Sequence, residues 1–291
     1  MSKPSIKLDH PFTAGEIAGL CGDLYGVADD RPPLVLLHGL TFDRRIWRPV
    51  LDGLQRADPH RHLLALDLPG HGDSPEHLPH STGHVVDLIH EAVIQAGMNA
   101  PVIVGHSMSG GLASIYAARY PSRGVVNLDA PPDLESVAKL LQPMKARIRG
   151  ADFPYVWANM QQSFRTDLLP PDARALVMAN SDPRQDLVCS YWAELLDESP
   201  EELTAALVAD MHTLAAIGIP YVLIAGAELR PEIRQLISDI LPEARVEVWA
   251  GSGHFPHLAH LDRFVEQLAA TGRWRIRPRL IRGRPGPANT T

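Results

Sequence analysis

Four short and largely apolar runs, each followed by a glycine, histidine or aspartate, constrain the fold of this chain most strongly. They are too short to be helices and are apolar on both faces, which is typical of central strands in a parallel sheet. Apolar side chains recur at helical spacing over residues 82–96 and 110–119, between these runs. This alternation predicts an α/β fold with a doubly wound, mostly parallel sheet. The four runs are Leu34–Leu37, Leu63–Leu66, Val102–Val104 and Val125–Leu128.

Residues 132–213 interrupt the alternation, because they contain several helical segments and little strand pattern. One helix start is well marked: Ser199 is suited to cap it, Pro200 to occupy its first position and Glu202 to complete a capping box. We therefore expect a core of residues 1–131 and 214–272 with a helical lid at 132–213 inserted into it. The later elements expected in the core are strands at 221–225 and 246–249 and helices near 231–240 and 261–271.

The charge of the chain is unevenly distributed. Residues 273–291 hold six of its 27 basic side chains, whereas all 34 acidic side chains precede them. Arg-Gly-Arg-Pro-Gly-Pro cannot sustain a helix or strand, so this segment is predicted to be a basic, flexible tail. An acidic body repels nucleic acid and anionic membranes, and we expect neither as a partner.

Other features bear on where the protein works. No apolar run approaches the roughly 20 residues that span a bilayer. The N-terminal residues lack the apolar centre of a signal peptide. The two cysteines, Cys21 and Cys189, lie far apart and form no Cys-x-x-Cys motif. These features together predict a cytoplasmic protein.

The most informative segment is Gly105-His-Ser107-Met-Ser109, which follows a strand and precedes a helix. A serine on such a tight turn presents its hydroxyl above the sheet, and the residues two before and two after it must be small. The usual pattern has glycine where this chain has Ser109. A second register, centred on Ser109 and ending at Gly111, also fits. Ser107 is preferred because it follows the end of the strand by two residues.

At this point the sequence resembles the α/β-hydrolase fold family, over about residues 20–272. Four motifs in the expected order carry the resemblance. The nucleophile turn is one, and the others resemble the family's oxyanion loop, the turn after the next strand and the catalytic-histidine loop. These three are Leu36-Leu-His-Gly-Leu-Thr41, Asp67-Leu-Pro-Gly-His-Gly-Asp-Ser74 and Gly251-Ser-Gly-His-Phe-Pro256.

The resemblance implies roles for individual residues. Ser107 is the expected nucleophile and His254 the expected base, since imidazole titrates near neutrality. The expected oxyanion hole consists of the backbone N–H groups of Leu40 and Met108. No cofactor and no metal are expected. The spacing of His254, His257 and His260 favours a metal site only weakly, because Pro256 interrupts the segment and no acidic cluster accompanies it.

The third catalytic member is less clear from the sequence. Family members usually carry aspartate three residues after the glycine that ends the seventh strand, but Leu229 occupies that position here. Asp129, at the end of the preceding strand, is the preferred acid, and its position is similar to that in zearalenone lactonase. Glu228, two residues after Gly226, is the alternative. The alternative interpretation of Asp129 is an aspartate that caps the end of the strand and has no catalytic role.

A serine nucleophile points to acyl transfer, so the predicted function is hydrolysis of a carboxylic ester or lactone. The alternatives are carbon–carbon bond hydrolysis, cofactor-free perhydrolysis, or a ligand receptor built on the same fold. Large apolar side chains in the lid predict a small apolar or aromatic substrate, although most of them can simply pack lid against body. The oligomeric state stays open. The expected substrate-binding residues are Trp157, Trp192, Phe153, Tyr155 and Met160.

Overall fold

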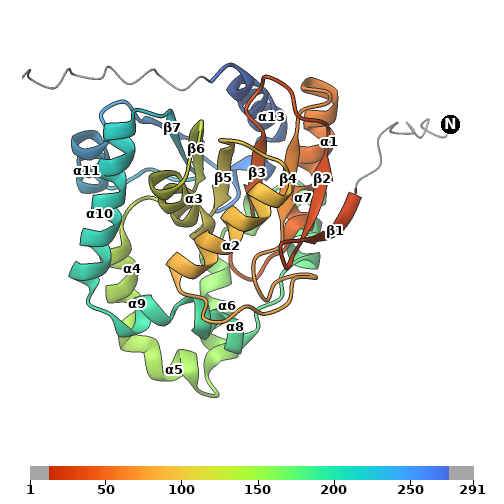
Figure 1. The fold of residues 1–291 in the computed structure, drawn as a ribbon. Helices are drawn as coiled ribbons and strands as arrows, with labels where there is room; N and C mark the ends of the chain where they lie inside the picture. Colours follow the sequence, from red (N-terminus) through yellow and green to blue (C-terminus); the bar gives the residue numbers. More distant parts are fainter. Residues whose placement is uncertain (1–12, 275–291) are drawn as a thin grey trace, which may run out of the picture.

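The computed structural model describes residues 13–274, which form an α/β fold around one eight-stranded sheet (Figure 1). The strand order is β1-β2-β4-β3-β5-β6-β7-β8, and every neighbouring pair from β4 to β8 is parallel. The predicted α/β fold with a mostly parallel sheet is therefore confirmed. The strands are β1 (Thr13–Ile17), β2 (Leu20–Tyr25), β3 (Leu34–Leu37), β4 (Leu63–Leu66), β5 (Val102–His106), β6 (Gly124–Leu128), β7 (Tyr221–Ala225) and β8 (Arg245–Val248).

The central strands are mostly apolar because each one serves two cores. Along β3, Val35 and Leu37 contribute to a core that includes residues of α2 and α3. Leu34 and Leu36 contribute to a second core, which includes residues of α1 and α13. Successive side chains of a strand point to opposite faces, so a sheet covered on both sides needs apolar residues at every position.

Helices cover both faces of the sheet. On one side α3 packs against α2 and α10, and on the other α1 packs against α13. Within residues 13–274, no helix is both long and apolar enough to cross a bilayer. The helices of the body are α1 (Arg48–Ala57), α2 (Thr82–Gln95), α3 (Met108–Arg119), α11 (Pro231–Ile240), α12 (Pro256–Ala259) and α13 (Leu261–Ala270), with the 3₁₀ turns η1 (Arg44–Trp47) and η4 (Thr271–Arg273).

A run of helices connects β6 to β7. Figure 1 shows α5, α6, α8 and α9 together at one end of the molecule, whereas α10 extends along the body, where it packs against α3. Its last helix, α10, continues to Ile217, so the expected domain boundary at 213/214 falls inside a helix. Ser199 caps α10 as predicted, but the carboxylate that its hydroxyl contacts is Glu201 (3.0 Å). The helices are α4 (Leu134–Leu141), α5 (Lys145–Arg149), α6 (Phe153–Ser163), α7 (Pro171–Ala179), α8 (Gln185–Tyr191), α9 (Ala193–Asp197) and α10 (Pro200–Ile217), with η2 (Gln142–Met144) and η3 (Thr166–Leu168).

The end of the described chain is ordered further than expected. Arg273 closes η4, and Trp274 packs against the core beneath α13. Both residues belong to the segment predicted as a flexible tail. The rest of that segment, residues 275–291, lies outside the described residues.

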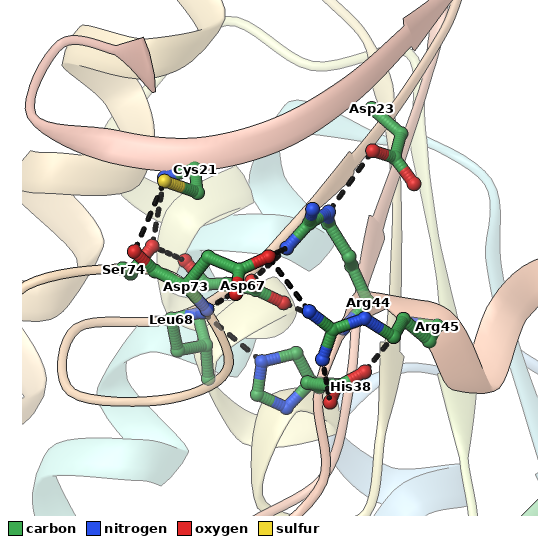
Figure 2. Close-up of polar contacts among 10 residues, drawn as sticks. Cys21, Asp23, His38, Arg44, Arg45, Asp67, Leu68, Asp73 and Ser74 are labelled. Carbon is green, nitrogen blue, oxygen red and sulfur yellow. Dashed lines mark hydrogen bonds and ion pairs between the residues drawn. The ribbon is translucent and has the colours of Figure 1, made fainter. Parts of the chain in front are cut away.

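A buried ion cluster joins the first half of the sheet to the loops above it (Figure 2). Arg44 in η1 pairs with three aspartates: Asp23 of β2, Asp67 after β4, and Asp73. Asp67 is fully buried and also accepts backbone N–H groups from Arg44 (2.7 Å) and Asp73 (2.8 Å). The guanidinium and these N–H groups together satisfy a carboxylate that would otherwise be costly to bury.

We predict that Arg44→Met lowers the free energy of unfolding by about 3–5 kcal/mol, because it leaves a buried carboxylate without its counter-charge. Arg45→Met is the matched control. Arg45 pairs with Asp43 and Asp73 but is 35% exposed, so its loss should cost below about 1 kcal/mol. Urea unfolding of both variants checks this, and equal losses would show that burial of the cluster is unimportant.

Candidate active site

Ser107 occupies a strained turn between β5 and α3. Its φ is 55° and its ψ is −130°, a conformation that few residues other than glycine adopt. The turn is held by the Ser107 N–H, which donates to the Leu128 carbonyl at the end of β6 (2.8 Å). A Cβ on Gly105 would lie 1.9 Å from the Ser109 carbonyl oxygen, so only glycine fits there. The local geometry is that of a nucleophile elbow.

Asp129 and His254 are hydrogen-bonded to each other. Nδ1 of His254 lies 2.7 Å from Oδ2 of Asp129, and the other carboxylate oxygen accepts the N–H of Gly226 (2.8 Å). Burial alone raises the pKa of Asp129, but the hydrogen bond from His254, the charge of that ring and the Gly226 N–H outweigh it, so the pKa is lowered. The carboxylate is therefore ionised at neutral pH.

Glu228, the alternative acid, lies elsewhere. Its side chain is 76% exposed and pairs with Arg234 (2.7 Å). The segment after β7 thus contributes no carboxylate to the pair formed by Asp129 and His254. It contributes only the N–H of Gly226, which donates to Asp129.

Asn127 fixes the turn on which Asp129 lies, and the sequence analysis did not single it out. Its amide accepts the N–H of Ala130 (3.1 Å) and donates to the carbonyl of the same residue (2.9 Å). It also donates to the hydroxyl of Tyr221 on β7 (2.9 Å). These bonds span Asp129, whose φ is 55°. A polar residue within the apolar strand Gly124–Leu128 was the available signal.

Phe164, between α6 and η3, holds the histidine from the inserted helices. Its carbonyl accepts the N–H of His254 (3.0 Å), and its ring stacks on the imidazole with centroids 4.8 Å apart. On the other side, Nε2 of His106 donates to the His254 carbonyl (2.7 Å). Both bonds use main-chain atoms, so the sequence carried no direct signal for them.

The expected oxyanion donors flank the elbow. Met108 is the first residue of α3, and the first N–H groups of a helix have no partner within it. Leu40 follows Gly39, at which a Cβ would be 3.2 Å from the Cβ of Ser107. The loop after β3 thus passes directly beside the serine.

Three of the expected substrate-binding residues form an aromatic group that leads toward His254. Trp157 packs against Phe153 (centroids 6.0 Å apart), Trp192 (5.8 Å) and Phe164 (6.3 Å). All three predicted members, Phe153, Trp157 and Trp192, are buried. Met160 is half-buried. Tyr155 lies outside the group: it is 64% exposed, and its ring lies 5.4 Å from the guanidinium of Arg147.

The histidines that follow His254 have separate surroundings. His257 is fully buried beside Trp47 (4.9 Å) and His106 (4.8 Å), whereas His260 lies against Trp249 (5.7 Å). Neither ring nitrogen of His257 has a hydrogen-bond partner among residues 13–274. Within the same residues, no group of three His, Cys, Asp or Glu side chains is arranged to hold a metal ion.

Comparison with known proteins identifies the family of this chain. The model of the alpha/beta hydrolase family matches residues 34–267, and the chain belongs to that family. It is 28% identical to a pimeloyl-[acyl-carrier protein] methyl ester esterase of Yersinia enterocolitica, over 80% of this chain and 90% of that protein. It is also 28% identical to a 2-succinyl-6-hydroxy-2,4-cyclohexadiene-1-carboxylate synthase of Serratia proteamaculans, over 82% and 92% of the two chains.

Solved structures show the same fold. A haloalkane dehalogenase DbeA variant of Bradyrhizobium elkanii superposes with a TM-score of 0.66 at 19% identity, over 91% of this chain and 96% of that one. A lipase-esterase related protein of Clostridium acetobutylicum gives the same TM-score at 17% identity, over 87% and 99%.

We predict that His257→Phe makes the protein more resistant to acid. Burial holds the pKa of His257 well below its usual range, so the folded protein keeps this ring neutral. Below about pH 6.5 the unfolded chain binds a proton there and the folded one does not, so stability falls as pH falls. Phenylalanine does not bind a proton, so the His257→Phe variant lacks this pH-dependent loss of stability.

Urea unfolding at pH 7 and at about pH 4.5 measures the effect. The loss of unfolding free energy between the two pH values should be smaller in His257→Phe than in wild type. His212→Phe, at an exposed position on α10, should leave the loss unchanged. An equal loss in wild type and His257→Phe would show that this ring does not titrate on unfolding.

Proposed function

We propose that this α/β hydrolase is a serine esterase that cleaves a carboxylic ester or lactone through an acyl-enzyme. The observation that carries the proposal is the 2.7 Å bond between His254 and Asp129, together with a serine on a strained elbow whose neighbour, His106, donates to the His254 carbonyl. A half-buried carboxylate of lowered pKa orients an imidazole and stabilises the imidazolium that forms during attack.

In the proposed mechanism, Ser107 Oγ attacks the carbonyl carbon while Nε2 of His254 takes its proton. Nδ1–H of His254 remains bonded to Asp129, which fixes the tautomer. The oxyanion accepts the backbone N–H groups of Leu40 and Met108. The imidazolium then protonates the leaving alcohol, and a water activated by His254 hydrolyses the acyl-enzyme.

The substrate that we propose is a small apolar or aromatic ester or lactone. The aromatic group Phe153–Trp157–Trp192 and the Phe164 ring on His254 support this, since they place apolar surface next to the proposed base. The helices from α4 to α10 would then act as a lid over the carboxyl ends of the strands, where ligands bind in open α/β sheets. The methyl ester esterase relative is consistent with ester cleavage. We propose no nucleic-acid or membrane partner and a cytoplasmic location.

The second candidate is chemistry at a carbon–carbon bond by the same residues. It is favoured by the equally similar relative that is a synthase. Turnover of simple p-nitrophenyl esters separates the two, because a carbon–carbon enzyme has no need for a stable acyl-enzyme. A protein that is slowly labelled by one equivalent of the ester and then shows no steady turnover would instead be a ligand receptor.

We predict that Ser107→Ala abolishes ester turnover and leaves the fold unchanged, since it removes one partly exposed hydroxyl. A fluorophosphonate should label wild-type protein once, and peptide mass spectrometry should locate the label at Ser107. His254→Ala should lose activity to a similar extent, because nucleophile and base act as a unit. Labelling at Ser109 would overturn the assignment.

The identity of the acid is tested by two isosteric amides. Asp129→Asn should lower kcat by about 10³–10⁴-fold, since the same change at a serine-protease triad costs roughly 10⁴. Glu228→Gln should change kcat by less than about tenfold, because Glu228 is exposed and paired with Arg234. Loss of activity in Glu228→Gln with normal activity in Asp129→Asn would reverse the two roles.

A further inference from the structure

The chain departs from the usual nucleophile pattern at Ser109, and the structure gives this serine a specific contact. Ser109 is the second residue of α3 and is fully buried. Its hydroxyl donates to the main-chain carbonyl of His38, 71 residues earlier in the sequence. A glycine at this position could not make the bond.

His38 is itself held on two further sides. Nε2 of its ring accepts the N–H of Leu68 (3.0 Å; Figure 2). The ring proton is therefore on Nδ1, which donates to the Gly39 carbonyl (2.8 Å). The ring is fully buried and lies 5.0 Å from that of His71. Burial lowers the pKa of His38, which keeps this tautomer neutral.

The bond from Ser109 to His38 connects the two segments that would supply the oxyanion hole. Met108 directly precedes Ser109, and Leu40 lies two residues after His38. Oxyanion donors must lie about 2.7–3.1 Å from the developing charge, so a small movement of either segment weakens the site. The Ser109 hydroxyl is a side-chain contact that spans both segments.

We propose that Ser109 is a positioning residue for catalysis, whose hydroxyl sets the distance between the Leu40 and Met108 N–H groups. This inference rests on the proposed esterase function. It assigns Ser109 no contact with the substrate, because its side chain is buried beneath the loop. The Ser109 hydroxyl should therefore contribute to kcat and make no contribution to substrate binding.

The test compares Ser109→Ala with Ser109→Gly, which restores the usual family residue. Both lack the hydroxyl, so both should lower kcat on a p-nitrophenyl ester by about 10–100-fold and leave KM within about twofold; complete removal of an oxyanion donor costs on the order of 10²–10³. A trifluoromethyl ketone, which forms a tetrahedral adduct with a serine nucleophile, should bind more weakly by a similar factor. Ser122→Ala is the matched control, because Ser122 is also buried but bonds to Tyr120 at the far end of α3.

Each outcome decides the question. Wild-type kcat and ketone affinity in either Ser109 variant would overturn the inference and leave the esterase function standing. A fall in activity that only matches the fall in folded fraction, measured by thermal unfolding, would also overturn the inference and leave the esterase function standing. A wild-type protein that neither hydrolyses esters nor reacts with a fluorophosphonate removes the proposed function, and the inference with it.

Discussion

The hydrogen bond between Asp129 and His254 is the contact on which the arrangement of this site depends. It joins the end of β6 to the loop after β8, and Gly226 after β7 supports the same carboxylate. Three parallel strands must therefore end at the same level for the bond to form. The pairing of β6 with β7 and of β7 with β8 meets that condition, because parallel strands deliver their carboxyl ends to one edge of a sheet.

The position of the acid also changes what the neighbouring segments must do. With the carboxylate on β6, the turn after that strand has to hold a non-glycine residue at positive φ, and Asn127 stabilises it by bonding both backbone groups of Ala130. If Asp129 is the acid that we propose, the loop after β7 has only to supply the Gly226 N–H to its carboxylate. Glu228 is accordingly free to form a surface ion pair with Arg234.

Strands that are buried on both sides were predicted most precisely from the sequence, whereas the hairpin at the edge of the sheet was missed. β3 and β4 are continuous apolar runs and were found to the residue, whereas the β1–β2 hairpin at the edge mixes polar and apolar positions and was not. Motifs located Ser107 and His254, and a position at the end of a strand indicated Asp129, although the catalytic roles of all three remain predictions. Asn127 gave one signal, a polar residue in an apolar strand, but the roles of Asn127 and Phe164 depend largely on bonds with backbone groups, whose positions only the folded chain defines.

The buried charges around Arg44 lie next to the loop after β3, which we propose to supply an oxyanion donor. Replacing a buried ion cluster by apolar side chains often costs no stability, so stability alone is a weak reason to have one. Here Asp67 binds the backbone of Arg44 on one side and of Asp73 on the other, and the next residue, Leu68, donates its N–H to His38. The cluster thus fixes the turn that holds the His38 ring, while Ser109 holds its carbonyl. The loop that we propose to present the Leu40 N–H to a transient charge is thereby ordered before any substrate binds, which is what electrostatic preorganisation requires.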